Sequence, residues 1–226
     1  MLKLFKSLTK FEFCLWLASS VIVCLSFILT PEKDILSLSA SLVGVTALIF
    51  IAKGYVAGQV LTIIFSVFYG IISFFYSYYG EMITYLFMST PMAIMATIEW
   101  YRNPYENSKE VKIRAVTKKQ LIGVALLSLA VTLVFYFMLK ALNTANLFFS
   151  TISITTSFFA ASLTYLRSPY YALGYTANDI VLIVLWVLAS IENPAYVPMI
   201  FCFIAFFFND VYGYINWTRM QKKQAE

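Results

Sequence analysis

The stretch FFFNDVYGYINWTRM, residues 206–220, decides how the rest of the chain is interpreted. It lies near the end of a mostly apolar chain, yet it carries acid, amide and phenol groups. At helical spacing Asn209, Tyr212 and Asn216 fall on one stripe, and Asp210 lies on the next. Such groups are costly inside an apolar helix unless they face a partner or a water-filled cavity. We therefore interpret the stretch as one wall of a polar binding site within a membrane. A polar cluster that packs helices together is the alternative.

The composition excludes an ordinary soluble domain. Of the 226 residues, 61% are hydrophobic and 12% are charged, about half the charged fraction of a typical soluble domain. The apolar residues come in long runs, each able to cross ~30 Å of hydrocarbon. The chain is therefore predicted to be an all-α integral membrane protein. It contains no His, which excludes His-based catalysis and imidazole metal ligands, and we expect neither a metal nor another cofactor.

Eight apolar runs are predicted to be transmembrane helices. In order, they cover residues 13–29, 35–52, 55–78, 82–101, 121–139, 147–166, 170–191 and 195–217. The first follows a basic segment, as in a signal peptide, but no small-residue cleavage site follows, so we expect it to be retained. Pro91 interrupts the fourth run and is expected to form a hinge or a fixed kink, because proline breaks a helical hydrogen bond. The hydrophilic segment 102–120 is too short to be a domain.

The distribution of basic residues fixes the expected orientation. Eight helices place both termini on one side, and 14 of the 16 Lys and Arg residues then fall on that side, leaving Lys33 and Lys140 on the other. Basic loops face the cytoplasm, so we expect cytoplasmic termini and a location in the cell (inner) membrane. The short loop Pro31–Asp34 is net acidic and is expected outside. Membrane orientation thus explains the net charge of +5, and no nucleic-acid partner is expected.

A weak internal repeat groups the helices. The fourth helix ends in WYR at residues 100–102 and the eighth in WTR at 217–219, so each W-x-R sequence closes a group of three helices. The first helix of each group ends on a cation, Lys53 or Arg167. A single fifth helix separates the groups, so both would cross in the same direction, a known transporter plan with its site between the repeats. The predicted divisions are an N-terminal helix (1–34), a first bundle (35–102), a loop with a linker helix (103–146), a second bundle (147–219) and a tail (220–226).

Two Asn-Asp pairs lie at the same predicted depth. Asn178-Asp179 in the seventh helix and Asn209-Asp210 in the eighth each begin eight residues, or about 12 Å, from the inner end of their helix. That depth is near the middle of a ~30 Å hydrocarbon core. The same level of the first bundle is mostly apolar, and its best polar candidates are Gln59, Thr62 and Ser66. We expect an asymmetric site whose polar face comes from the second bundle.

Three motifs carry a resemblance to a known family. They are YGEM at residues 79–82, Asn178, and N-D-x-Y-G-x-x-N-W at residues 209–217. With the helix order, they make the chain similar to the PnuC-type vitamin transporters over about residues 35–220. That resemblance implies a SWEET-like fold of two parallel three-helix bundles. It also implies facilitated diffusion of nicotinamide riboside or a related nucleoside-like compound, uptake driven by phosphorylation inside the cell, and a homotrimer.

One departure from the family leaves the substrate open. The nicotinamide riboside transporters usually carry Trp residues just before the amide of the seventh helix, whereas this chain reads YALGY at residues 171–175. A cationic nicotinamide ring is stabilised by aromatic faces, which Tyr175 or Trp186 would supply. A deoxyribonucleoside or thiamine remains an alternative substrate.

The resemblance and the polar pattern together suggest roles. Asn178 and Asn209 are expected to bind sugar hydroxyls or a base edge, because an amide both donates and accepts. Asp179 and Asp210 are expected to orient these amides, or Asp210 to face a cationic ring; pairing of Asp179 with a basic residue is the alternative. Stacking candidates are Tyr175, Trp186, Tyr212 and Trp217, but for Trp217 the terminal position favours the alternative role of an interfacial anchor. The predicted substrate-binding residues are Asn178, Asp179, Asn209, Asp210, Tyr212, Asn216, Trp186, Tyr175 and Gln59.

Two other classes of protein remain open. An intramembrane enzyme would use Asp179 and Asp210 as paired carboxyls. A receptor or assembly subunit would bind a ligand without moving it. A transporter is our first choice, with a small nucleoside-like molecule and the bilayer as partners and with no enzyme activity.

Overall fold

The computed structural model describes residues 2–30, 35–75 and 78–226. The acidic loop Pro31–Asp34 and residues 76–77, near the end of the third predicted helix, lie outside the described residues. The helices are α1 (Leu2–Phe5), α2 (Lys10–Leu29), α3 (Ile35–Ala52), α4 (Val56–Phe75), α5 (Tyr79–Ile83), the π-helix η1 (Thr84–Ser89), α6 (Thr90–Arg102), α7 (Lys118–Ala141), α8 (Leu147–Tyr165), α9 (Tyr170–Glu192), the 3-10 helix η2 (Pro194–Tyr196) and α10 (Val197–Ala225).

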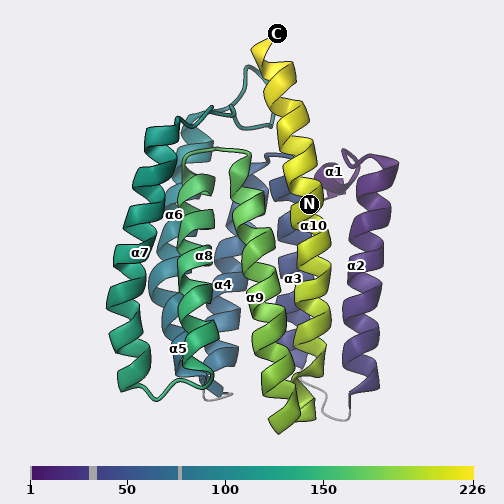
Figure 1. Ribbon diagram of the computed structural model, residues 1–226. Coiled ribbons are helices and arrows are strands. Elements are labelled where there is room, and N and C mark those ends of the chain that lie inside the picture. The colour runs from purple at the N-terminus through teal and green to yellow at the C-terminus, as the bar shows by residue number, and fades with distance from the viewer. Residues whose placement is uncertain (1, 31–34, 76–77) are drawn as a thin grey trace.

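The prediction of eight spans is confirmed. Within the described ranges, eight helical stretches are long and apolar enough to cross a membrane, the fourth being α5, η1 and α6 in succession. The largest difference from the sequence is at the end of the chain, where α10 continues to Ala225 instead of stopping at Trp217. Its last turns project beyond the bundle, at the end where α1 also lies (Figure 1).

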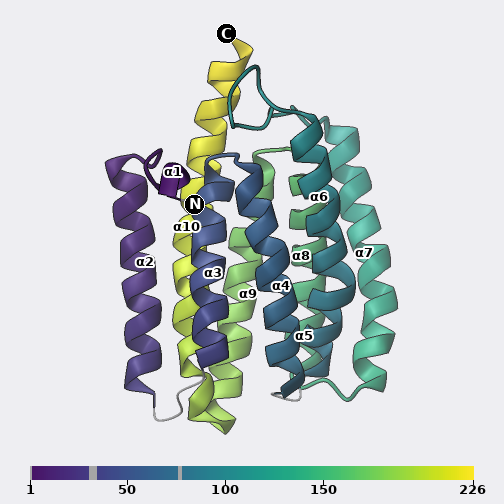
Figure 2. The ribbon, with the colours of Figure 1, turned by 180° about the vertical axis from the view of Figure 1, so that it is seen from behind.

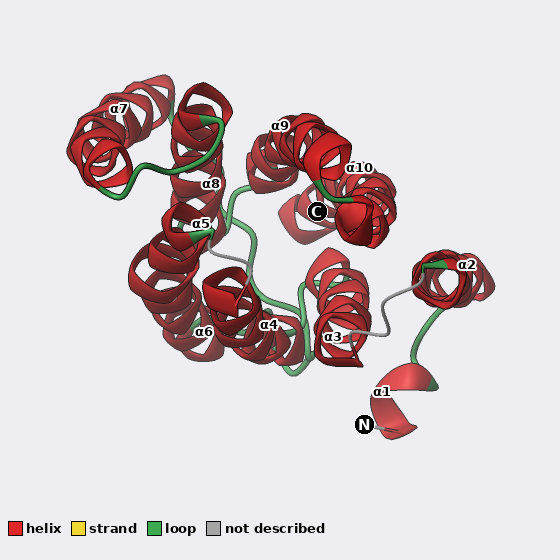
Figure 3. Ribbon diagram, turned by 90° about the horizontal axis from the view of Figure 1, so that it is seen from below, coloured by secondary structure: helices red, strands yellow, loops and turns green. Residues whose placement is uncertain are grey.

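Six of the crossing units close a ring. α3 packs on α4, α4 on α6, α6 on α8, α8 on α9, α9 on α10, and α10 back on α3, as the view along the bundle shows (Figure 3). Half of the ring comes from the first predicted bundle and half from the second. α2 lies outside the ring against α3 and α10, and α7 lies outside it against α8 (Figures 2 and 3).

The two W-x-R sequences meet at the end of the bundle where the termini lie. The indole rings of Trp100 and Trp217 are fully buried, with centroids 5.1 Å apart. Trp100 Nε1 donates a hydrogen bond to the carbonyl of Thr164 at 2.9 Å, and Trp217 Nε1 donates to the carbonyl of Ile51 at 2.8 Å. Each tryptophan therefore joins the last helix of its own half to the first helix of the other half. Burial of Trp217 contradicts the interfacial-anchor alternative.

The turns that follow those two carbonyls are equivalent. Gly54 and Arg167 both have positive φ, +69° and +59°. Each donates its amide to the carbonyl three residues earlier, and the next residue donates to the carbonyl five residues back. The equivalent of Arg167 is thus Gly54 and not Lys53, one residue away from the match that the cations indicated.

The loop between α6 and α7 runs across both turns. The amide of Val111 donates to the carbonyl of Gly54 at 2.9 Å, and that of Arg114 donates to the carbonyl of Arg167 at 3.0 Å. The side chain of Gln224, near the end of α10, accepts from the amide of Ile113 at 2.7 Å. The hydrophilic loop therefore crosses from one half to the other over the buried tryptophans.

The fourth span is widened before Pro91. Residues Thr84–Ser89 form a π-helix, and the amide of Thr90 donates to the carbonyl of Tyr85, five residues back. Pro91 is the second residue of α6, and because Ser89 before it is also helical, the span continues through the proline from η1. π-Helical turns often mark functional sites, and here the turn carries Tyr85 and Ser89 to the centre of the ring.

Candidate functional site

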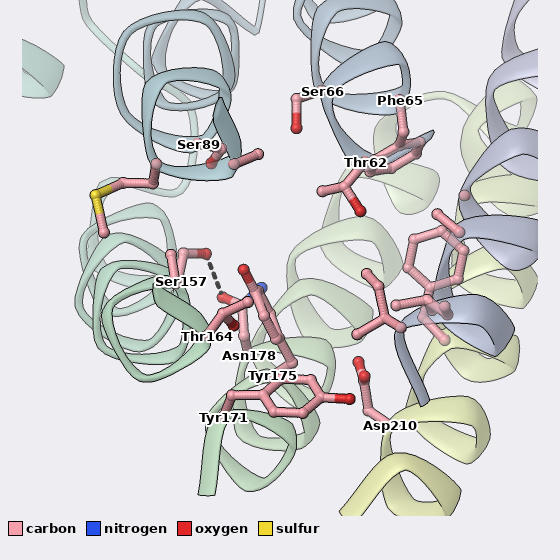
Figure 4. Close-up of a pocket in the computed structure, with 18 of the residues that line it drawn as sticks. Thr62, Phe65, Ser66, Ser89, Ser157, Thr164, Tyr171, Tyr175, Asn178 and Asp210 are labelled. Atoms are coloured by element: carbon pink, nitrogen blue, oxygen red, sulfur yellow. Dashed lines mark hydrogen bonds between the residues drawn. The ribbon is translucent and has the colours of Figure 1, made fainter. Parts of the chain in front are cut away.

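A polar cavity occupies the centre of the ring (Figure 4). The space that the centre of a water molecule can reach inside it is about 80 Å³, room for on the order of six waters. Side chains of all six ring units line it, so it lies between the two predicted bundles. Its polar lining consists of Gln59, Thr62, Ser66, Tyr85, Ser89, Ser157, Thr164, Tyr171, Tyr175, Asn178, Asp179 and Asp210.

Asn178 is held in a fixed orientation on α9. Its Oδ1 accepts hydrogen bonds from Thr156 Oγ1 at 2.8 Å and from Ser157 Oγ at 2.9 Å, both on α8. The second of these bonds is visible in Figure 4. Because both lone pairs of the oxygen are used, the amide Nδ2 is the group that Asn178 can offer to a ligand.

Asp179 and Asp210 meet at the cavity wall. They come from the adjacent helices α9 and α10, are each 3% exposed, and lie close enough to interact directly. The phenol of Tyr171 points toward Asp210 (Figure 4). Gly213, one turn after Asp210, makes room for that phenol, since a Cβ there would lie 3.0 Å from the Tyr171 hydroxyl.

The first half contributes neutral groups. Gln59 on α4 is 1% exposed and its Nε2 has no hydrogen-bond partner among the described residues. Thr62 donates its hydroxyl to the carbonyl of Gly58 at 3.0 Å. Gln59 lines the cavity, and Thr62 and Ser66 face it in Figure 4. Every charged group in the lining therefore belongs to the second half.

The stripe of Asn209, Tyr212 and Asn216 does not line this cavity. Asn209 Nδ2 donates to Ser19 Oγ of α2 at 2.9 Å and to the carbonyl of Ala205 at 2.8 Å. Asn216 Nδ2 donates to the carbonyl of Ala52 on α3 at 2.8 Å. For these amides the contacts favour the helix-packing alternative.

Tyr212 belongs to a polar cluster at the start of α2. Its hydroxyl donates to Glu12 Oε1 at 2.9 Å, and Lys53 Nζ contacts both carboxylate oxygens of Glu12 at 3.0 and 3.1 Å. Thr9 and Glu12 also form a capping box, in which Glu12 accepts from the Thr9 amide. Glu12 is 2% exposed, so the cluster fixes α2 to α3 and α10 through a buried charge.

Trp186 lies outside the cavity, toward the end of the bundle away from the termini. Its Nε1 donates to the hydroxyl of Tyr69 at 3.0 Å. Tyr69 packs on Tyr85, with ring centroids 4.2 Å apart, and Tyr85 lines the cavity. Trp186 therefore touches the site through two intervening rings. Of the aromatic candidates, Tyr175 is the one placed in the lining.

Several lining residues were missed in the sequence. Ser157, Thr164 and Ser89 are small hydroxyl residues, which in apolar helices are usually packing residues. Tyr171 was overlooked because it lies one turn from the helix end. The signal for it was the D-x-x-G pattern of Asp210 and Gly213, which leaves space for a large neighbour.

The chain matches proteins of known family. The family model described as "Nicotinamide mononucleotide transporter" matches residues 34–219. A nicotinamide riboside transporter PnuC of Neisseria mucosa is 28% identical over 99% of this chain and 86% of its own length, and one of Haemophilus influenzae is 25% identical over 92% and 90%. A crystal structure of the vitamin B3 transporter PnuC superimposes with a TM-score of 0.85 at 26% identity, covering 98% of this chain and 96% of that one.

Proposed function

This chain belongs to the nicotinamide mononucleotide transporter family and is a multi-pass membrane transporter, and we propose that it carries nicotinamide riboside. The observation that supports this most directly is the cavity between the two halves of the ring, where polar side chains of both halves meet. Ligand sites of transporters built from repeats lie at that interface, near the bilayer midplane. Asn178 and Gln59 offer amide groups suited to ribose hydroxyls and a carboxamide.

The lining favours the riboside over the mononucleotide. A phosphate group adds a charge of about −1.5 to −2 at pH 7, and a buried anion needs a cation or several donors. The cavity-lining residues that the structure describes include no Lys and no Arg, but they include Asp179 and Asp210. A phosphate in this cavity would face two carboxyl groups without a compensating charge.

The same proposal covers how transport is organised. The bundles of residues 35–102 and 147–219 form the two sides of the site, and residues 1–34, 103–146 and 220–226 serve as N-terminal helix, loop with linker helix, and tail. Movement is facilitated diffusion, and phosphorylation inside the cell keeps the free substrate concentration low and so drives uptake. The protein lies in the cell membrane with both termini cytoplasmic, as the basic residues require, and assembles as a homotrimer.

Calorimetry on the detergent-purified protein tests the substrate. Nicotinamide riboside, nicotinamide mononucleotide, thymidine, deoxyadenosine and thiamine are titrated side by side. We expect saturable binding of nicotinamide riboside and at least about tenfold weaker binding of the mononucleotide, equivalent to about 1.4 kcal/mol. Preferential binding of a deoxynucleoside or of thiamine would replace the proposal by the alternative substrate.

Two Asn→Ala variants form a matched pair for the site. Asn178→Ala removes an amide that lines the cavity, whereas Asn216→Ala removes one that contacts the backbone of α3. We expect Asn178→Ala to abolish measurable binding and Asn216→Ala to leave the affinity within about threefold, or ~0.7 kcal/mol. Uptake into liposomes separates a transporter from a receptor, which would bind without flux. Unaltered ligand after incubation argues against the intramembrane enzyme.

A further inference from the structure

The carboxyl pair in the cavity has no cationic partner. Asp179 and Asp210 line the cavity, and two cations at the ends of ring helices pair with other acids. Lys53 pairs with Glu12 at 3.0 Å and Arg167 with Glu99 at 3.3 Å. In the described part of the chain, no Lys or Arg forms an ion pair with either aspartate. Two carboxyl groups in direct contact share one proton, so the pair carries one negative charge, and that charge is left for a ligand to balance.

One oxygen of the pair also lacks a hydrogen-bond donor in the residues that the structure describes. Asp179 Oδ2 is buried without a hydrogen-bond partner among the described residues. The phenol of Tyr171 is aimed at Asp210 from the side of α9 (Figure 4). Carboxylates that serve only to pack helices are normally paired or hydrogen-bonded through all their oxygens. An open carboxylate oxygen at a cavity wall instead marks a place for a ligand.

A second, independent group points into the same space. Gln59 comes from α4 in the other half, and its Nε2 is a buried donor that lacks an acceptor. The cavity thus offers an unused donor, Gln59 Nε2, on one side and an unused acceptor, Asp179 Oδ2, next to a negative charge on the other. A ligand that satisfies both carries an acceptor, such as a carbonyl or hydroxyl, and a positive charge.

We propose that Asp179 and Asp210 make the cavity selective for substrates with a positively charged ring over neutral ones of the same shape. This inference rests on the proposed function and names the substrate property that the site recognises, which is the positive charge of the ring. Aromatic faces near a cation add to the attraction, and Tyr171 and Tyr175 lie beside the pair. The phenols thus take the place of the Trp residues that the resembling transporters carry in this helix.

A pair of isosteric ligands isolates the charge. Nicotinamide riboside has a cationic pyridinium ring, and its 1,4-dihydro form has the same ribose and carboxamide on a neutral ring. On the full-length purified protein we expect the cationic form to bind at least about tenfold more tightly. Equal affinities, or tighter binding of the dihydro form, would overturn the proposal.

Isosteric variants assign the selectivity to residues. The double variant Asp179→Asn/Asp210→Asn removes the charge of the pair and is expected to weaken binding of the cationic form by about tenfold or more and to change the dihydro form by less than about threefold. Each single variant leaves one ionised aspartate and is expected to have a smaller effect on the cationic form. Glu192→Gln is the control, because it removes one negative charge from the same helix 13 residues, or about 20 Å, away. It should leave both affinities unchanged. A parallel loss of both ligands in the Asp variants, with unchanged unfolding temperatures, would contradict a role for charge.

This design separates the two proposals. If both forms bind with equal affinity, nicotinamide riboside is still supported as a substrate and only the charge selectivity is contradicted. If neither form binds and thymidine binds tightly, the proposed substrate and the proposed charge selectivity are both contradicted. Tight binding of thiamine, whose ring is also cationic, refutes the substrate and keeps the selectivity, provided that the Asp variants weaken it to the same extent.

Discussion

The two halves of the ring are related by symmetry at the end near the termini, but they differ at the level of the cavity. At the end near the termini, Trp100 and Trp217 make the same hydrogen bond to opposite halves, and Gly54 and Arg167 turn the chain in the same way. At the cavity, one half supplies amide and hydroxyl groups and the other supplies both acids. The closing contacts of a repeat retain their symmetry because they hold the halves together. The proposed binding site is not symmetric, because a nucleoside-like substrate has a ring at one end and a sugar at the other.

The largest effect tests the symmetric end. Trp100→Ala and Trp217→Ala each leave a large buried cavity and are expected to lower the free energy of unfolding by about 3–5 kcal/mol. Trp100→Phe and Trp217→Phe lose mainly the hydrogen bond and should each cost about 1 kcal/mol. Unfolding of the protein in detergent micelles measures all four. A large cost for one tryptophan and a small cost for the other would show that the equivalence is only geometric.

The ion pairs near the two equivalent turns should contribute unequally to stability. Lys53 pairs with Glu12, which is 2% exposed, whereas Arg167 pairs with Glu99, whose side chain is 28% exposed. Lys53→Met leaves a buried carboxylate without its cationic partner and should lower the free energy of unfolding by about 3 kcal/mol. Glu99→Gln removes a more solvated charge and should cost less than about 1 kcal/mol. Equal losses in thermal unfolding would mean that solvent exposure does not separate the two pairs.

A smaller effect compares two serines across the cavity. Ser157→Ala removes one of the two hydroxyls that orient Asn178, so nicotinamide riboside should bind about fivefold more weakly, or ~1 kcal/mol. Ser66→Ala removes a hydroxyl of the same size from the first half and should change the affinity by less than twofold, roughly 0.4 kcal/mol. Calorimetric titration of both variants provides the comparison. A stronger effect at Ser66 would mean that the first half carries more of the recognition than its neutral lining suggests.

The smallest expected effect concerns Gly213. An alanine Cβ would lie 3.0 Å from the Tyr171 hydroxyl, and a phenol at the end of a side chain can move by a few tenths of an ångström. Gly213→Ala is expected to cost less than about 1 kcal/mol in stability and to weaken binding of nicotinamide riboside only about twofold. Binding and unfolding are measured on the same preparation. A complete loss of binding would show that the Tyr171–Asp210 arrangement tolerates no shift.

Hydropathy predicted the spans well and the direction of side chains poorly. Apolar runs must match the thickness of the bilayer, so the helix ends were found within a few residues, except at the end of α10, which continues past Trp217 to Ala225. Neighbouring residues of a helix point about 100° apart, so Asp210 faces the cavity while Asn209 faces Ser19 of α2. Which of the two residues faces the cavity depends on where α2 packs. The sequence of an apolar helix has no strong hydrophobic periodicity that would reveal the packed face. Glu12, just before the first predicted span, was the overlooked sign that α2 has polar partners.

The contacts of α2 also bear on how the chain is made. Glu12 meets Lys53 as soon as the next helix is in place, but its bond to Tyr212 and that of Ser19 to Asn209 span 200 and 190 residues. At the usual 5–20 residues per second, synthesis of that interval takes roughly 10–40 s. Until α10 is made, α2 can be held against α3 only by contacts such as the Glu12–Lys53 ion pair and the Trp16–Thr46 hydrogen bond. α10 then packs against α2 and α9 and supplies the remaining polar partners of α2.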